Sequence, residues 1–338
     1  PPVSRASFSA SADLPLAVGP AIRMAFLSGS TPPFSPDVSQ GSLMPLVATL
    51  IANPSRPALT RELADRASRA VGASRIDWLA EGVAADLFLE GGANEGESLA
   101  ALRSALGDAP VDAAVQEAET RRKKLLLADM DSTMIDQECI DELADEVGVK
   151  EHVAAITARS MNGEIAFEPA LRERVALLRG LDAGVIGRII ETRLTLAAGG
   201  RALVATMNAA GAWTALVSGG FLSFTGPIAA KLGFRENRAN TLLEEGGRLT
   251  GEVADPILGR EAKAEALAEI AARLGVTPAE AIAVGDGAND LDMLALAGTG
   301  VALHAKPAVA ARAKIRIDHG DLTALLYLQG YRREEFCA

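Results

Sequence analysis

The pattern of apolar and polar positions divides the chain into three regions. Residues 1–43 are rich in Ser, Pro and Gly and carry no sustained period, as in the run Ser28-Gly29-Ser30-Thr31-Pro32-Pro33. Such a composition rarely packs into a core, and it predicts a disordered or non-native tail. Because Met44 directly precedes an apolar run, we expect the folded protein to start near this residue.

Residues 44–120 contain short apolar runs typical of strands and short segments with helical spacing, which together predict a small α+β domain. Apolar runs at 46–51 and 84–89 indicate strands, and helical spacing indicates helices at 60–70 and 99–106. The polar segment 112–124 is expected to be helical as well. No catalytic constellation is visible in this region.

From residue 121 to 338 the pattern is that of an α/β protein. Short, fully apolar runs at 125–128, 212–217 and 281–284 are typical of buried parallel strands, and helical segments at 201–210, 261–274 and 289–297 separate them. This alternation predicts a doubly wound, Rossmann-like parallel sheet, in which ligands bind at the carboxyl ends of the strands. The mostly helical stretch at about 133–196 is too long for a simple crossover, and we interpret it as a cap inserted over that crevice.

Composition and charge narrow the possible functions. The hydrophobic fraction of 49% allows a sizeable core, and the net charge of −11 argues against a general nucleic-acid binder. No run of about 18 uncharged apolar residues is present, so no membrane span is expected. Two cysteines, Cys139 and Cys337, are too few for a disulfide framework and favour a cytoplasmic protein.

The first candidate site residues are Asp129 and Asp131, which directly follow the apolar run at 125–128. Two carboxylates at a strand end are costly to bury unless a cation compensates them, and Mg²⁺ prefers such oxygen ligands. One carboxylate could then attack phosphorus while the other transfers protons. An Asp-x-Asp pair also occurs in calcium loops and on ordinary surfaces, so this pair alone does not decide the function.

Two further segments could hold an oxyanion. Ser218 and Gly219 end the run at 212–217, where a hydroxyl and backbone N–H groups can face a phosphate. Lys263 lies on the predicted helix at 261–274. Most lysines on helices are simply solvated, so only its position in the chain makes it a candidate site residue.

The segment 285–290, Gly-Asp-Gly-Ala-Asn-Asp, is the most specific feature, because a strand, glycines, acids and an amide coincide there. The glycines permit close backbone approach, Asp286 and Asp290 supply oxygen ligands, and Asn289 supplies a neutral donor and acceptor.

Taken in chain order, these segments resemble the four motifs of the haloacid dehalogenase superfamily of phosphohydrolases over residues 123–320. The resemblance implies that Asp129 is the nucleophile and Asp131 the general acid and base. It implies that Mg²⁺ is held by Asp129, Asp286 and the backbone carbonyl of Asp131. The remaining phosphate-binding and orienting residues would be Ser218, Gly219, Lys263, Asn289 and Asp290.

Within that superfamily the chain is similar to the phosphoserine phosphatase family. The resemblance implies that Glu138 meets the substrate ammonium group and that Arg174, in the cap, pairs with its carboxylate. It therefore implies hydrolysis of phosphoserine in serine biosynthesis. Alternatives are another small phosphomonoester, such as phosphohomoserine or phosphothreonine, or a non-catalytic amino-acid sensor. A weaker similarity of the N-terminal region to the ACT fold suggests amino-acid binding or homodimer contacts.

Overall fold

The computed structural model describes residues 45–161 and 164–338, so the tail expected at residues 1–43 lies outside the described residues. The chain first forms an antiparallel sheet in the order β2-β3-β1-β4, with both helices packed on one face. Its elements are β1 (Leu46–Ala52), α1 (Arg61–Val71), β2 (Ala73–Ala80), β3 (Ala84–Leu89), α2 (Glu95–Leu106) and β4 (Val111–Glu117).

The helix expected at 112–124 is wrong. Most of this segment's first half is strand β4, which pairs with β1 from Val111↔Ala52 to Glu117↔Leu46. The alanines at 113 and 114 suit a helix, but tertiary pairing of the backbone outweighs that weak local preference. Strand β2, which lies at the edge of the sheet, was not predicted because its polar side chains hide the alternation.

The second sheet is parallel throughout and has the order β12-β11-β10-β5-β6-β7. Its strands are β5 (Leu125–Ala128), β6 (Trp213–Phe221), β7 (Glu236–Asn240), β10 (Ala281–Gly285), β11 (Thr299–Leu303) and β12 (Ile315–Ile317). From β5 the chain winds outward to β6 and β7, then returns to the other side of β5 with β10. The predicted doubly wound, Rossmann-like fold class is therefore confirmed, and its switch point lies beside β5.

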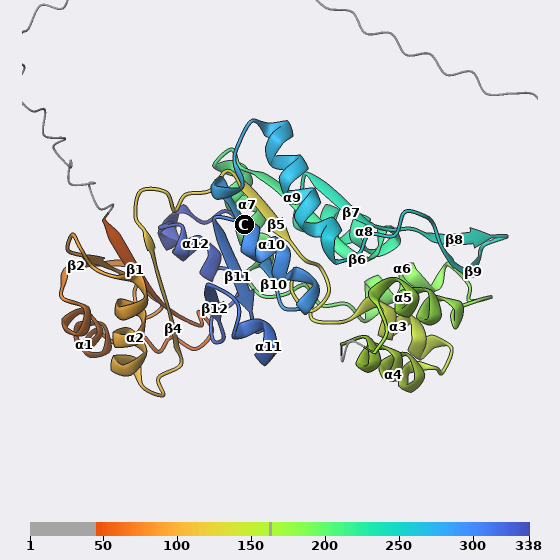
Figure 1. The fold of residues 1–338 in the computed structure, drawn as a ribbon, viewed down its shortest axis with the longest axis horizontal. Coiled ribbons are helices and arrows are strands. Elements are labelled where there is room, and N and C mark those ends of the chain that lie inside the picture. The colour runs from red at the N-terminus through yellow and green to blue at the C-terminus, as the bar shows by residue number, and fades with distance from the viewer. Residues whose placement is uncertain (1–44, 162–163) are drawn as a thin grey trace, which may run out of the picture. The chain divides into compact units, whose positions relative to one another are not determined.

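Helices cover both faces of this parallel sheet (Figure 1). One face packs against α9 (Arg260–Leu274), α10 (Leu291–Leu296) and α11 (Pro307–Ala310). The other packs against α7 (Gly200–Ala209), α8 (Leu222–Leu232) and α12 (Ala324–Leu328). Within β5, Leu125 and Leu127 face the first layer while Leu126 and Ala128 face the second, which explains why the run is apolar without alternation.

The chain between β5 and α7 forms a helical cap of α3 (Cys139–Glu146), α4 (Lys150–Met161), α5 (Phe167–Ala176) and α6 (Val185–Thr192). A two-stranded hairpin, β8 (Leu242–Glu245) and β9 (Arg248–Val253), leaves the core after β7 and joins the cap. The backbone N–H of Gly180 donates to the carbonyl of Leu249 at 2.8 Å, and that of Leu249 donates to Leu181 at 2.9 Å. The hairpin therefore ties the cap to the core at a second point.

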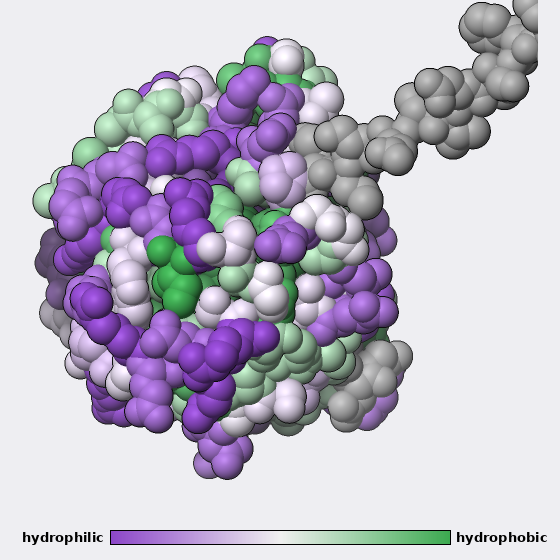
Figure 2. All heavy atoms as spheres, turned by 90° about the vertical axis from the view of Figure 1, so that its left-hand side faces the viewer, coloured by the Kyte–Doolittle hydropathy of each residue, from purple (hydrophilic) through white to green (hydrophobic). Residues whose placement is uncertain are grey.

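The N-terminal sheet turns its helix-free face toward the core. Ile51, Leu79 and Ala114 belong to the same buried cluster as Leu325 and Tyr327 of α12. Figure 2 shows the side of the molecule that carries β2 and α1, where hydrophilic side chains predominate and hydrophobic ones gather in a central area. In the described part of the chain, no helix combines the length and hydropathy needed to cross a bilayer.

Candidate active site

The loops that follow β5, β6 and β10 come together because these strands are neighbours in one parallel sheet. Together with the cap they enclose a cavity of about 560 Å³. Every residue that the sequence singled out for the site lines this cavity except Lys263 and Asp290, which lie beneath it. The predicted residues at the cavity wall are Asp129, Asp131, Glu138, Arg174, Ser218, Gly219, Asp286 and Asn289.

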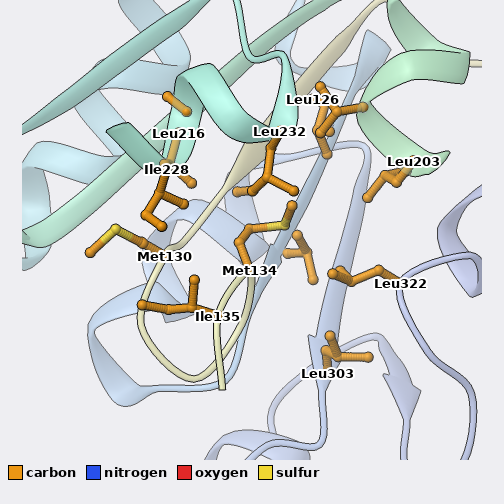
Figure 3. Packing of buried hydrophobic residues seen from close by; sticks show 14 of the residues in the cluster. Leu126, Met130, Met134, Ile135, Leu203, Leu216, Ile228, Leu232, Leu303 and Leu322 are labelled. Carbon is orange, nitrogen blue, oxygen red and sulfur yellow. The ribbon is translucent and has the colours of Figure 1, made fainter. Parts of the chain in front are cut away.

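The loop after β5 is fixed from behind by its apolar side chains. Met130, Met134 and Ile135 are fully buried, and they point into a cluster with Ile228 and Leu232 of α8 (Figure 3). With Met130 in this cluster, the carboxylates on either side of it reach the cavity. The alternation of acid, apolar and acid residues therefore places two acids at one wall.

Asp129 shares a buried ionic network with Lys263 and Asp290. The Lys263 Nζ lies 2.6 Å from Oδ1 of Asp129 and 2.6 Å from Oδ1 of Asp290, and all three residues are at most 5% exposed. Burial opposes the charge on Lys263, but the two carboxylates outweigh it and raise the pKa of the amine. Burial and the neighbouring Asp290 raise the pKa of Asp129, while Lys263 opposes this shift.

Asp286 completes a group of three acids that could hold a cation. One oxygen each of Asp129, Asp286 and Asp290 lies within 4.8 Å of the others. Burial, and then repulsion from Asp290, raise the pKa of Asp286 to about 7. Lys263 supplies one positive charge for three buried carboxyl groups, so a hard divalent cation fits the remaining charge and the oxygen donors. The carboxylate of Asp131 lies outside this group, and Asp290 is inside it.

Close packing at this site requires glycine at position 285. A Cβ on Gly285 would lie 2.3 Å from Cγ of Asp290, so any side chain there would displace that carboxylate. The Asp290 carboxylate also accepts the backbone N–H of Gly287 at 2.9 Å, which closes the turn that carries Asp286.

Asp131 is held by partners different from those of Asp129. Its Oδ1 accepts the backbone N–H of Cys139 at 3.0 Å, and its Oδ2 accepts the hydroxyl of Ser218 at 3.4 Å. Burial, and then the charge of Glu138, raise the pKa of Asp131 to about 6. A carboxyl group with this pKa can carry a proton near neutral pH, as a general acid must. A Cβ on Gly220 would come within 2.9 Å of Oδ2 of Asp131, so this contact also depends on glycine.

The cap brings Glu138 and Arg174 to the same cavity. Glu138 is exposed before α3, and its Oε1 accepts the Ser132 hydroxyl at 2.8 Å. The guanidinium of Arg174 on α5 donates to the Ala170 carbonyl at 3.1 Å and to the Thr157 hydroxyl at 3.3 Å. Burial lowers the pKa of Arg174, and no carboxylate among the described residues forms an ion pair with it.

Several lining residues were not predicted from the sequence, and they include Thr157, Arg260 and Lys306. Thr157 lies on α4 and positions Arg174, while Arg260 at the start of α9 pairs with Asp292 at 2.6 Å. Lys306 precedes α11, and its backbone carbonyl accepts the N–H groups of Val309 and Ala310. Only the three-dimensional arrangement brings these residues to the cavity, because none lies in the segments that carry the paired acids and glycines.

Comparison with known proteins places this site in a family. Residues 126–295 match the family model described as haloacid dehalogenase-like hydrolase. The phosphoserine phosphatase of Streptomyces coelicolor is 44% identical over 241 residues, which are 70% of this chain and 58% of that protein. The phosphoserine phosphatase of Albidiferax ferrireducens is 47% identical over 210 residues, which are 61% of this chain and 89% of that protein.

Solved structures agree with these matches. A phosphoserine phosphatase solved as an analogue of its phospho-aspartyl intermediate has a TM-score of 0.57 and 40% identity, and the match covers 61% of this chain and 98% of that chain. The chain thus spans less than two thirds of the Streptomyces relative but nearly all of this solved structure.

Proposed function

Because the chain belongs to the haloacid dehalogenase-like hydrolase family, we propose that it hydrolyses O-phospho-L-serine to L-serine and phosphate, the last step of serine biosynthesis. One observation carries the proposal. A single cavity is lined both by the acids of the phosphatase motifs and by an acid and an arginine of the cap, Glu138 and Arg174, which suit the two charges of an amino acid.

In the first step, a carboxylate oxygen of Asp129 would attack phosphorus in line with the ester oxygen of serine. The Asp129–phosphorus bond forms, the bond between phosphorus and the serine oxygen breaks, and Asp131 donates its proton to the leaving oxygen. The hydrogen bonds from Cys139 and Ser218 hold Asp131 in place for this transfer.

In the second step, Asp131 would take a proton from water, whose oxygen attacks the phosphorus of the aspartyl phosphate and releases phosphate and Asp129. The similar phosphoserine phosphatase that was solved as a phospho-aspartyl intermediate analogue supports this route. Ser218, the Gly219 amide and Lys263 would neutralise and orient the phosphoryl oxygens, and Asn289 would lie beside them.

The residues fit a magnesium ion, with Asp129, Asp286 and the backbone carbonyl of Asp131 as the proposed ligands. The fit rests on three buried carboxyl groups whose oxygens lie within 4.8 Å of one another and which Lys263 alone does not neutralise. When bound, Mg²⁺ would stabilise the charge that develops on the transferring phosphoryl group.

Recognition of the amino acid would depend on the cap. A planar guanidinium suits a carboxylate in two-point contact, so Arg174 would bind the substrate carboxylate while Glu138 meets the ammonium group. Phe167 would add an apolar wall, since it lines the same cavity beside Gly219.

The decisive experiment is phosphate release from phosphoserine, phosphothreonine and phosphohomoserine, each measured with Mg²⁺ and with a chelator. We expect the highest kcat/KM for phosphoserine and loss of turnover on chelation. Asp129→Asn should abolish turnover, whereas Asp136→Asn, a matched change of an exposed aspartate in the same loop, should not. A preference for another phosphomonoester would show that phosphoserine is not the substrate. Unchanged turnover in Asp129→Asn would show that Asp129 is not the nucleophile.

A further inference from the structure

The backbone of Ser132 adopts a conformation that serine rarely takes. Its φ is +55°, in the left-handed region, where the Cβ of an L-residue crowds the following carbonyl oxygen. Of the described residues other than glycine, only Ser132 and His304 have a positive φ. Glycine would adopt this conformation without the crowding, so the strain at Ser132 points to a use for its side chain.

The side chain of Ser132 reaches the acid that the cap contributes to the catalytic cavity. Its hydroxyl donates to Oε1 of Glu138 at 2.8 Å, and its backbone N–H donates to the Gln137 carbonyl at 3.3 Å. The backbone N–H of Cys139 donates to Oδ1 of Asp131 at 3.0 Å. These three hydrogen bonds fold residues 131–139 back on themselves, so the position of Glu138 depends on the conformation of Ser132.

Glu138 is placed to face the cavity rather than its own helix. It is the N-cap residue of α3, a position from which a side chain commonly accepts an N–H group of the first turn. Within the described chain its carboxylate makes no such capping hydrogen bond. The described residues that line the catalytic cavity include Glu138 but not Ser132. The side chain of Ser132 therefore acts on the cavity through Glu138.

Building on the proposed function, we propose that Ser132 is a positioning residue that holds the Glu138 carboxylate ready for the ammonium group of the substrate. The Ser132 hydroxyl occupies Oε1, which leaves Oε2 available to accept a hydrogen bond from that group. Glu138 is exposed, so this contact also restricts the rotation of a side chain that would otherwise be free. Ordering a binding group before the ligand arrives increases affinity.

Kinetics of Ser132→Ala and Ser132→Gly test the proposal, because both variants lack the hydroxyl. We expect each to raise KM for phosphoserine about tenfold with little change in kcat, since the lost hydrogen bond to a charged group acts on binding. Hydrolysis of p-nitrophenyl phosphate, which has no ammonium group, should be unchanged. Ser55→Ala is the matched control, because it removes an exposed serine hydroxyl that donates to Asn53 outside the cavity.

A Glu138→Ala background tests whether the effect passes through Glu138. In that background Ser132→Ala should raise KM no further, because residues in contact are coupled in a double-mutant cycle. An undiminished effect there would overturn the proposal, as would an equal loss of activity on p-nitrophenyl phosphate.

Urea unfolding of the same two variants tests the strained backbone. Only alanine keeps the Cβ, so Ser132→Gly should have the higher urea midpoint. A midpoint of Ser132→Ala equal to or above that of Ser132→Gly would overturn the strained conformation on which the proposal stands.

The kinetic comparison uses whichever of phosphoserine, phosphothreonine and phosphohomoserine the wild-type protein prefers. A preference for one of the other two would contradict the proposed substrate and leave the test of Ser132 in force. A preference for phosphoserine with an unaltered KM in both Ser132 variants would overturn the positioning role alone.

Discussion

The two neighbouring acids of the catalytic cavity, Asp129 and Asp131, have different surroundings, which suit their different proposed roles. Asp129 contacts a buried lysine, whereas Asp131, two residues later, contacts a backbone N–H and a hydroxyl. The sequence predicted both acids from their place after an apolar run. It did not predict their protonation, because that depends on burial and, for Asp129, on Asp290 and Lys263, which are distant in the chain and become neighbours only on folding.

The protonation of Asp131 leads to a pH prediction. Since burial raises its pKa to about 6, the proton-bearing form is present below that value and is lost as the pH rises through it. We expect kcat/KM for phosphoserine to fall on the alkaline side, and Asp131→Asn to lower kcat by about two to four orders of magnitude. Rates over a pH series measure both effects.

The control for this prediction is p-nitrophenyl phosphate, whose leaving group departs without help from an acid. The rate of p-nitrophenyl phosphate hydrolysis should fall less at alkaline pH than the rate with phosphoserine. Asp131→Asn should also reduce this rate less than it reduces the rate with phosphoserine. Identical pH profiles and identical losses for the two substrates would contradict a proton-donating role.

Among the elements, the cap helices α4 and α5 position one another's side chains. Thr157 of α4 holds the guanidinium of Arg174 of α5, which has no carboxylate partner within the described chain. An unpaired, largely enclosed arginine is costly unless a ligand meets it. The sequence predicted a mostly helical cap at about 133–196, but not this pairing between its helices, because side-chain direction depends on how the helices pack.

Arg174→Ala should therefore lower kcat/KM for phosphoserine by about 10- to 100-fold, the effect of one charged hydrogen bond. Hydrolysis of p-nitrophenyl phosphate, which has no carboxylate at that place, should change little. Arg172→Ala is the matched variant, since Arg172 lies on the same helix but pairs on the surface with Glu168 and Asp255. Equal losses of kcat/KM on the two substrates would show that Arg174 does not recognise the substrate carboxylate.

The packing of the β8–β9 hairpin against the cap can be tested by measuring stability. Gly251 has φ +78°, and a Cβ there would lie 2.9 Å from Cβ of Arg179 in the cap. Gly246 has φ +59° with open space around it. We expect Gly246→Ala to lower the free energy of unfolding by about 1–2 kcal/mol through backbone strain alone. Gly251→Ala should cost about 1–3 kcal/mol more through steric overlap.

Urea midpoints of the two alanine variants give this difference. If both variants lost the same stability, the close contact between hairpin and cap would not exist in solution.

At the scale of the whole molecule, the two sheets are joined by polar contacts that the sequence does not reveal. The Asp112 carboxylate on β4 accepts three backbone N–H groups about 206 residues later in the chain. Gln116 donates to the Leu328 carbonyl at 2.6 Å. Apolar runs predicted β1, β3, β5, β6 and β10 but not the other strands of the two sheets, which are β2, β4, β7, β11 and β12. Periodicity also carries no information about which distant loop a side chain meets.

Asp112→Asn should lower the free energy of unfolding by about 1–3 kcal/mol, because the amide NH₂ would face N–H donors and leave buried groups unpaired. The matched variant is Asp108→Asn, four residues earlier in an exposed turn, where no loss is expected. Denaturant unfolding of both proteins measures the difference. A neutral Asp112→Asn would show that these hydrogen bonds contribute nothing to the joining of the sheets.

The shared packing of Ile51 and Ala114 with Tyr327 also limits how this protein could recombine with its relatives. A chimaera spliced at the segment between β4 and β5 would set a foreign strand surface against the native α12. Shape mismatch there would leave voids or collisions in the interior. A workable graft must therefore carry α12 along with the N-terminal sheet, so two segments far apart in the sequence would have to be exchanged together.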